Sequence, residues 1–439
     1  MSASVRTGGD AAGKALFAAY GLLVSAAVWF VLVPFELLRI LARRSSWQTL
    51  RERLGLWEAP PARGCRLLMH AVSAGEVAAA GAVLRRLAAE EPALSVVLTT
   101  GNRDGLAAAR RLASRLPVID AAAYLPWDRP RAVRRFLESV RPDLAAVVET
   151  EIWPALFLAC PALRIPLVIV NGRVLPGDVA RYHRAHGFFR RVLASAQWIG
   201  AQNAAEADRF LTIGARPDTV HVSGSLKFDL AFPPPPAAGA LARALAGDPP
   251  VVVAGSTHAP EESLLLRALV DVRREQPDTR LVVAPRHTRR APAIVRLSRR
   301  LGLGAFPLSR LSPGAAWDVL VLDSIGLLAG AYGRARVAFV GGSLAPVGGH
   351  NPLEAAAHGV PVVMGPHTEH VADAVLRLSD AGALARVDGA GALSETLRAL
   401  LSDETRRADM GSRARAAAEA GRGAAEATAR ALLVGLREA

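Results

Sequence analysis

The sequence contains few cysteines and few aromatic residues. Only Cys65 and Cys160 occur in 439 residues, and neither lies in a Cys-X-X-Cys or Cys/His cluster. This excludes a disulfide framework, argues against structural zinc and favours a reducing compartment. Aromatic residues make up 5% of the chain, and no basic run is interleaved with stacking side chains. A nucleic-acid partner is therefore not expected, and the formal net charge of +14 instead favours phosphates or anionic lipid.

Two common nucleotide signatures are also missing. The sequence has neither a GxxxxGK[ST] loop nor a GxGxxG turn, so ATP and dinucleotide binding lack their usual support. The chain is nevertheless 51% hydrophobic, and its length is sufficient for two domain-sized cores.

One long uncharged run is present near the N-terminus. Residues 15–35 carry no charge, and about 20 apolar residues suffice for a helix to cross a bilayer. More arginines follow this run than basic residues precede it, which places the remainder of the chain in the cytoplasm. We expect residues 1–45 to form an anchor with a basic flank at the cytoplasmic face of the cell inner membrane.

Two other interpretations of this run were weighed. A cleaved signal peptide is disfavoured, because the run is longer than a usual signal core and no small-x-small cleavage site precedes the arginines. A helix that lies in the membrane interface stays open, because Pro34 and Glu36 shorten the end of the span.

Beyond residue 60, short Val/Leu/Ile-rich runs alternate with longer Ala/Leu/Arg-rich helical patterns. This alternation predicts an α/β fold in which helices cover both faces of parallel sheets. The expected strands are 66–72, 94–99, 144–149, 166–170, 198–202 and 220–224, followed by 250–255, 280–284, 318–323, 337–342 and 361–365.

A proline-rich stretch separates the two strand series. We expect a first Rossmann-like domain at 46–229, a linker at 230–249 and a second Rossmann-like domain at 250–439, with a cleft between the domains. Ligands of such domains bind at the carboxyl ends of the strands, and the notable motifs of this chain follow expected strands.

Three motifs follow strands of the first series. Ser73 and Glu76 have the spacing of a capping box, which needs no chemistry, but Glu76 is also suited to take a proton from an acceptor hydroxyl. Glu149 and Glu151 flank a threonine after a buried strand, so we expect at least one of them to face the cleft rather than to form an ordinary polar turn. Lys227 precedes the linker, where a lysine can neutralise a leaving phosphate, although a lone lysine is more often a solvated surface charge.

The second series ends in turns rich in glycine and histidine. Arg286 follows one strand and offers a bidentate charge to phosphate. Helix initiation explains Asn351 as an N-cap, Pro352 at the first helical position and Glu354 in the first turn. It does not explain the glycines, serine and histidine before them, which suit a nucleotide phosphate.

These motifs together resemble those of the 3-deoxy-D-manno-octulosonic acid (Kdo) transferases. The resemblance covers nearly the whole chain and rests on the anchor and on HAVSAGE, ETEIWP, GSLKFD, STHAPEE, APRH, FVGGS, GGHNPLEAA and GPHT. It implies a GT-B fold and transfer of Kdo from CMP-Kdo to the lipid A precursor (lipid IVA), with inversion and without a metal or other cofactor. The implied partners are CMP-Kdo, the lipid A precursor and anionic lipid of the inner membrane.

The resemblance also implies roles for individual residues. Glu76 would be the general base, and Glu149 and Lys227 would stabilise the transition state. CMP would be bound by three segments, Pro285 and Arg286, then Ile325, Gly326 and Leu327, and then Asn351, Pro352, Leu353 and Glu354. Leu327 stands where the family usually has a glutamate, so a side-chain contact from this position to CMP is not expected, whereas a backbone contact would survive.

Two competing hypotheses remain. A membrane-associated GT-B transferase that uses a UDP-sugar would carry different cleft motifs, and comparison of CMP-Kdo with UDP-sugars separates the two. A non-catalytic basic scaffold that binds anionic lipid predicts lipid binding unaffected by Glu76→Ala, and it leaves the strand-end motifs unexplained.

Overall fold

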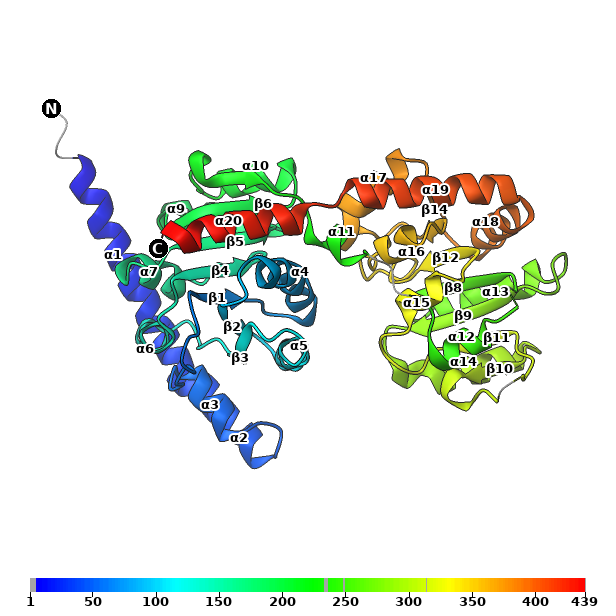
Figure 1. Cartoon of the computed structure of the whole chain (residues 1–439), viewed down its shortest axis with the longest axis horizontal. Coiled ribbons are helices and arrows are strands. Elements are labelled where there is room, and N and C mark those ends of the chain that lie inside the picture. The colour runs from blue at the N-terminus through cyan, green and yellow to red at the C-terminus, as the bar shows by residue number, and fades with distance from the viewer. Residues whose placement is uncertain (1–4, 233–235, 248, 313, 439) are drawn as a thin grey trace. The chain divides into compact units, whose positions relative to one another are not determined.

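The computed structural model describes residues 5–232, 236–247, 249–312 and 314–438, with side chains from residue 15 onward. Residues 1–4 of the expected anchor, 233–235 and 248 of the expected linker, and 313 and 439 of the expected second domain lie outside this description. The chain divides into two compact units, one formed by Met1–Leu230 with Arg422–Ala439 and the other by Ala231–Gly421 (Figure 1).

The first unit contains a seven-stranded parallel sheet with the strand order β3-β2-β1-β4-β5-β6-β7. Its strands are β1 (Arg66–His70), β2 (Ser95–Thr100), β3 (Ile119–Tyr124), β4 (Leu144–Val148), β5 (Leu167–Gly172), β6 (Ala196–Ala201) and β7 (Val220–Val222). Its helices are α1 (Val5–Ala27), α2 (Val33–Leu41), α3 (Trp47–Arg53), α4 (Ala74–Glu90), α5 (Arg103–Ala113), α6 (Pro130–Val140), α7 (Pro154–Ala162), α8 (Pro176–Arg184), α9 (His186–Leu193), α10 (Ala204–Thr212), α11 (Leu226–Leu230) and α20 (Ala424–Glu438).

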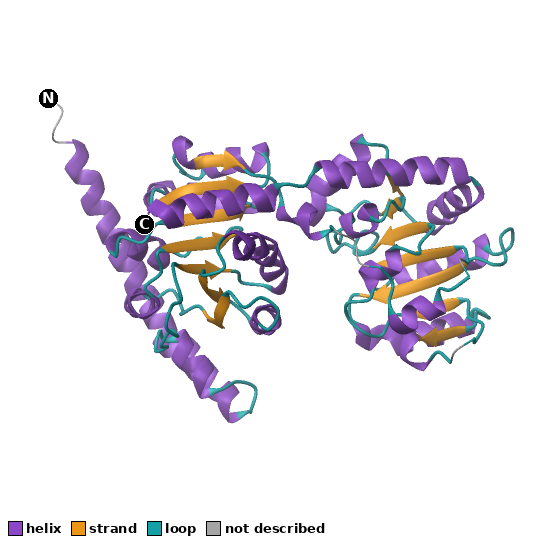
Figure 2. Ribbon diagram, in the orientation of Figure 1, coloured by secondary structure: helices purple, strands orange, loops and turns teal. Residues whose placement is uncertain are grey.

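The core of this unit lies on both faces of the sheet. Alternate residues of β1 point to opposite faces, so Leu67 and Met69 pack with α4 and α20, whereas Leu68 packs with α6 and α7. Both faces of the central strands are therefore buried, as the Val/Leu-rich runs predict. Figure 2 shows the strands lying between layers of helices.

The second unit contains another seven-stranded parallel sheet, with the order β10-β11-β9-β8-β12-β13-β14. Its strands are β8 (Val251–Thr257), β9 (Arg280–Pro285), β10 (Ala305–Pro307), β11 (Val319–Val321), β12 (Val337–Val340), β13 (Val362–Met364) and β14 (Leu384–Arg386). Its helices are α12 (Gly239–Ala244), α13 (Glu261–Val272), α14 (Ala291–Arg300), α15 (Leu328–Tyr332), α16 (Leu353–Ala357), α17 (Ala372–Asp380), α18 (Ala390–Ser402) and α19 (Glu404–Ala420).

The C-terminal helix lies elsewhere than expected. The sequence placed residues 250–439 in one domain, but α20 packs on the first unit, where Leu432, Leu433 and Leu436 join the core beside α4. The Asp229 carboxylate accepts hydrogen bonds from Gly423 N at 3.0 Å and Ala425 N at 2.9 Å, so it caps the start of this helix. The apolar face of α20 is thereby buried against the first sheet.

The apolar N-terminal run is helical. The helices α1 and α2 are joined by a π-helical stretch (Val28–Leu32), and the segment Ala15–Leu41 is long and apolar enough to cross a membrane by length and composition.

Candidate active site

Glu76 lies at the start of α4, directly after β1. Ser73 Oγ accepts a hydrogen bond from the Glu76 amide at 3.3 Å and donates one to Glu76 Oε1 at 2.7 Å. The other carboxylate oxygen, Oε2, accepts a hydrogen bond from Val72 N at 2.8 Å. The expected capping interaction is therefore present. It holds a carboxylate that is 9% exposed in one orientation. Burial raises the pKa of Glu76, and the negative charge of Glu149 adds to this rise.

Glu149 follows β4 in a left-handed backbone conformation, with φ of 62°. Its amide donates to Val170 O at 2.9 Å, so the strand pairing continues up to this residue before the chain turns. Burial, Glu76 and Glu149, in that order, raise the pKa of Glu151 to about 7. The three carboxylates thus share one electrostatic environment at the carboxyl edge of the first sheet.

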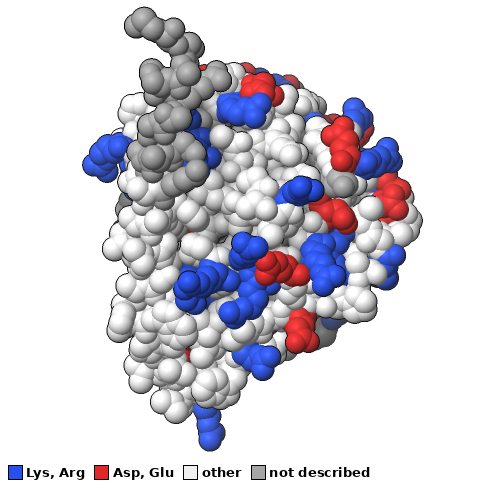
Figure 3. All heavy atoms as spheres, turned by 90° about the vertical axis from the view of Figure 1, so that its left-hand side faces the viewer, with Lys and Arg blue, Asp and Glu red and all other residues white. Residues whose placement is uncertain are grey.

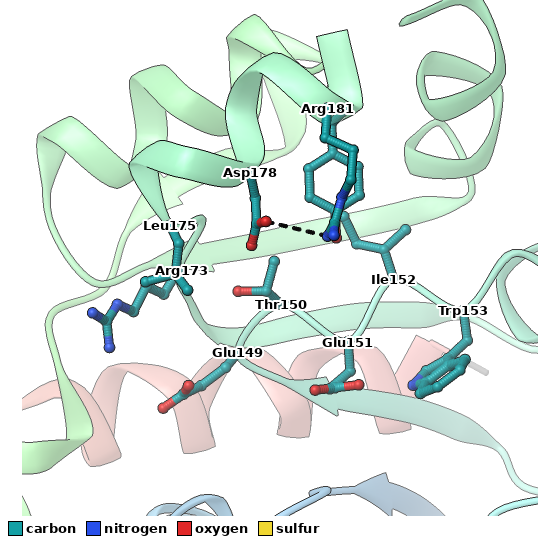
Figure 4. A pocket seen from close by; sticks show the side chains of 10 residues that line it. Glu149, Thr150, Glu151, Ile152, Trp153, Arg173, Leu175, Asp178 and Arg181 are labelled. Atoms are coloured by element: carbon teal, nitrogen blue, oxygen red, sulfur yellow. Dashed lines mark ion pairs between the residues drawn. The ribbon is translucent and has the colours of Figure 1, made fainter. Parts of the chain in front are cut away.

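A hollow of about 410 Å³ lies beside Glu149 and Glu151. Figure 4 shows these two carboxylates on one side of the hollow, with Arg173 and the ion pair of Arg181 with Asp178 (3.3 Å) on the other. The side chains come from the turns after β4 and β5, two neighbouring strands, and from α8, which follows β5. The hollow therefore combines acid and guanidinium groups that can bind a polyhydroxylated, charged substrate.

Asn171 links Glu149 to the helix α11, which carries Lys227. This residue is 1% exposed, and its side-chain Nδ2 lies 3.5 Å from Glu149 Oε1, while its Oδ1 accepts Leu226 N at 3.0 Å. Lys227, half-buried on α11, is thereby held in the same neighbourhood as Glu149, and α11 also packs against α4. The sequence analysis did not assign Asn171 a role. An Asn-Gly pair at the end of a buried strand was the available signal.

The second unit contains a carboxylate within the STHAPEE motif to which the sequence analysis assigned no role. Glu261 on α13 is fully buried and accepts five backbone hydrogen bonds, from His258 N (2.8 Å), Gly342 N (2.9 Å), Ser343 N (3.0 Å), Leu344 N (2.9 Å) and Ala345 N (3.2 Å). The amides of the glycine turn after β12 are therefore occupied within the protein. The expectation that this turn binds a nucleotide phosphate is wrong for the amides of residues 342–345.

Histidines gather beside this turn. Nε2 of His258 and Nε2 of His350 lie 2.8 Å apart, and their rings stack with centroids 5.1 Å apart. Burial, His258 and then Arg286 lower the pKa of His350 to about 4, and burial is also the main cause that lowers the pKa of His258. Both rings are mainly uncharged at neutral pH, so Arg286, which is exposed directly after Pro285, is the positive group next to them.

The remaining predicted residues lie at the same edge of the second sheet. The helix α16 begins at Leu353 with Pro352 at its N-cap, so it starts one residue later than predicted, and the expectation of Asn351 as N-cap and Pro352 as first helical residue is wrong by one position. Asn351 Oδ1 still accepts a hydrogen bond from Leu353 N at 3.1 Å, just before the helix. Burial raises the pKa of Glu354 in the first turn of α16.

The segment after β11 presents an unusual apolar side chain to solvent. Ile325 is 93% exposed, Gly326 has φ of 93°, and Leu327 is half-buried. The structure brings His258, Arg286 and His350 together, but among the described residues it shows no hydrogen bond from the Ile325 segment to them.

Comparisons with known proteins agree with the motifs. Residues 48–230 match the family model of 3-deoxy-D-manno-octulosonic-acid transferases (kdotransferases). The 3-deoxy-D-manno-octulosonic acid transferase of Haemophilus influenzae is 32% identical over 330 residues, 73% of this chain and 75% of that protein. The enzyme of the same name from Bordetella pertussis is 33% identical over 363 residues, 77% of this chain and 82% of that protein.

A solved structure supports the fold. UDP-GlcNAc 2-epimerase from Neisseria meningitidis, bound to UDP-GlcNAc, matches with a TM-score of 0.59 and 15% identity, over 85% of this chain and 100% of that chain. The similarity concerns the fold alone, and it confirms the predicted GT-B type with two Rossmann-like units.

The buried carboxylate of Glu261 makes a testable prediction for stability. Glu261→Gln replaces one acceptor oxygen by an amide donor that faces backbone N–H groups, so we expect a loss of about 3 kcal/mol of unfolding free energy. Glu404→Gln, at a side chain that is 83% exposed, is the matched control and is expected to change stability by less than about 0.5 kcal/mol. Urea denaturation and amide exchange at residues 342–345 measure both effects. Equal stability of the two variants with unchanged protection of these amides would contradict this role of Glu261.

The raised pKa of Glu151 makes a prediction for pH dependence. Because the folded-state pKa of about 7 lies above the ordinary glutamate pKa of 4.5, this carboxyl group stabilises the fold below about pH 4.5, and that contribution is lost as the pH rises through 7. Glu151→Gln removes this dependence. The unfolding free energy of Glu151→Gln minus that of wild type is therefore expected to be roughly 2 kcal/mol larger at pH 8 than at pH 5. Urea titrations at the two pH values test this, with Glu90→Gln as an exposed control; parallel pH dependence of wild type and Glu151→Gln would disprove it.

Proposed function

The chain belongs to the family of 3-deoxy-D-manno-octulosonic acid (Kdo) transferases, and from this premise we propose that it is an inverting glycosyltransferase. It moves Kdo from CMP-Kdo to the lipid A precursor lipid IVA during lipopolysaccharide assembly. The observation that carries this proposal is the fixed, buried Glu76 carboxylate next to Glu149 and Glu151 at the carboxyl edge of the first sheet.

Glu76 acts as the general base in this proposal. A sugar hydroxyl of the acceptor attacks the anomeric carbon of Kdo, its proton passes to Glu76, and the bond from that carbon to the CMP phosphate breaks with departure of CMP. The hydrogen bonds from Ser73 and Val72 leave the Glu76 carboxylate in one orientation, which favours proton abstraction from one position. Burial raises the pKa of Glu76 and so increases its basicity once it is ionised.

Glu149 and Lys227 stabilise the charges that develop during transfer. A carboxylate stabilises the positive charge on the departing sugar, and an ammonium group stabilises the negative charge on the leaving phosphate. The hydrogen bonds of Asn171 support this assignment, because they connect Glu149 with the backbone of the helix that carries Lys227.

The donor nucleotide is bound by the second unit. Arg286 pairs with the phosphate of CMP, and Pro285, Ile325, Gly326, Leu327, Asn351, Pro352, Leu353 and Glu354 surround the nucleoside. The uncharged His258 and His350 rings beside Arg286 provide hydrogen-bonding groups without extra charge. The reaction needs no metal or other cofactor in this proposal, since CMP is a good leaving group and Lys227 and Arg286 supply positive charge.

In this proposal the enzyme works at the cytoplasmic face of the cell inner membrane, and the apolar helix with its basic flank supports this location. The acceptor is a phosphorylated lipid of that membrane, so a membrane-bound enzyme meets it in two dimensions. Anionic lipid is a further partner, because arginines close to a membrane surface are attracted to it.

The role of Glu76 is tested by Glu76→Gln, which preserves the size of the side chain. We expect kcat to fall by about 10²–10⁴-fold, because the amide cannot accept the proton. CMP affinity is expected to stay within about twofold, because the proposed nucleotide residues lie in the other unit. Glu90→Gln, at the exposed far end of the same helix, is the control and should retain wild-type turnover. A Glu76→Gln enzyme with wild-type kcat would exclude this base.

A further inference from the structure

A basic hollow lies at the end of the apolar N-terminal helix. Its volume is about 370 Å³, and its wall is formed by the end of α2, the following loop, the start of α3 and one side of α5. Five arginines line it: Arg39, Arg43, Arg44, Arg103 and Arg110. Neither the sequence motifs nor the proposed transfer reaction uses this hollow.

The backbone at the end of α2 brings these arginines together. Arg43 has φ of 54°, which ends the helix, and Arg44 N then donates to Arg39 O at 2.7 Å. The turn directs the Ser45 hydroxyl back to the buried carboxylate of Glu36, to which it donates. The loop is therefore folded against its own helix, and its arginines face those of α5.

Packing beneath the hollow keeps its shape. The guanidinium of Arg53 lies 4.3 Å from the centroid of the Tyr124 ring, and Tyr124 is one of the lining residues. Arg53 Nη1 also donates to Leu125 O at 2.9 Å, and Glu52 Oε2 accepts Tyr124 N at 3.0 Å. These bonds tie α3 to β3, so two walls of the hollow are fixed to each other.

The hollow contains more positive than negative charge. Arg39 pairs with Glu36 at 3.1 Å. Within the part of the chain that the structure describes, Arg43, Arg44, Arg103 and Arg110 form no ion pair with a carboxylate. Guanidinium groups bind phosphate through two parallel hydrogen bonds, and several of them around one space favour a group with two negative charges over one with a single charge.

The apolar surface next to the hollow identifies the source of the phosphate. Leu38 and Leu41, which directly precede the arginine loop, are 64% and 80% exposed, and Trp47 directly after it is 64% exposed. In Figure 3 the charged side chains gather in the middle and on the right of the face in view, whereas its left part has few of them. A soluble phosphate would not require this surface, whereas a lipid places its phosphate directly above its acyl chains.

The helix is also held along the body of the unit. Tyr20 Oη donates to Asp128 Oδ2 at 2.6 Å, Val28 is 1% exposed, and Arg129 lies 5.4 Å from the ring centroid of Trp29. One side of the helix thus packs on the protein, while the other exposes Leu23, Phe30 and Phe35. This arrangement fits a helix in the membrane interface, which would put the arginine hollow at the level of the headgroups.

We propose that the hollow binds the phosphate monoester headgroup of a membrane lipid. The arginines supply paired hydrogen bonds to the phosphate, and the exposed leucines and Trp47 contact the acyl chains. This binding does not depend on Kdo transfer, so its failure would leave the proposed activity untouched.

The test compares vesicles of equal surface potential. The purified full-length protein is mixed with phosphatidylcholine vesicles that contain either phosphatidic acid, a phosphate monoester, or phosphatidylglycerol, a diester, and bound protein is measured by flotation. We expect wild type to bind phosphatidic acid about tenfold more tightly than phosphatidylglycerol. The double variant Arg103→Gln/Arg110→Gln should lose this preference and bind both vesicles equally.

Arg111→Gln/Arg115→Gln is the matched control. It removes two exposed arginines in or directly after α5 that do not line the hollow, and it should keep the tenfold preference even if overall binding weakens. The proposal is overturned if wild type shows no preference, or if Arg103→Gln/Arg110→Gln keeps it. A third result would also overturn it. If the protein shows no preference between the two kinds of vesicle, but inorganic phosphate raises the melting temperature of wild type and not that of Arg103→Gln/Arg110→Gln, the ligand is a soluble ion.

Discussion

Backbone N–H groups at the carboxyl ends of buried parallel strands must find acceptors, and the carboxylates of Glu76, Glu206 and Glu261 meet this need after several of the strands. Glu76 accepts a hydrogen bond from Val72 N at 2.8 Å, and Glu206 accepts one from Val174 N at 2.7 Å. Glu261 accepts hydrogen bonds from four amides of the turn after β12 and from His258 N after β8. Each carboxylate lies in the first turn of the helix that follows a strand, where the helix dipole also favours negative charge. The same constraint therefore fixes the strand-to-helix turns and leaves oriented acids at the edge where substrates of such sheets bind.

The proposed chemistry depends on how these acids differ. The Glu76 carboxylate accepts two hydrogen bonds that fix its orientation. Burial and the two acidic neighbours instead raise the pKa of Glu151 to about 7. Glu261 has no capacity left for a ligand, because its oxygens are used by the turn. A glycine-rich turn after a strand is thus not sufficient for a phosphate site. In this turn an internal carboxylate takes the place that an external anion would occupy.

Much of the fold could be predicted from the sequence, because central strands buried on both faces require continuous Val/Leu/Ile runs. The strands that were missed, β3, β10 and β14, each lie at the edge of a sheet. They are alanine-rich or only three residues long, so they lack that signal. The capping bonds between Ser73 and Glu76 were predicted because caps are local in sequence, whereas α16 begins one residue later than the predicted cap at Asn351. Glu261 was missed because its acceptor role involves residues 81–84 positions away, and the packing of α20 on the first unit depends on contacts that no local pattern encodes.

The most direct measurement of the central claim is a transfer reaction with defined substrates. The purified full-length protein is incubated with CMP-Kdo, generated in the same reaction, and a tetra-acylated lipid A precursor without added metal, and the lipid is analysed by mass spectrometry. The account predicts a lipid that is heavier by one or more Kdo residues, and no added sugar when UDP-sugars replace CMP-Kdo. An unchanged lipid with CMP-Kdo, or a product formed only with a UDP-sugar, would contradict it.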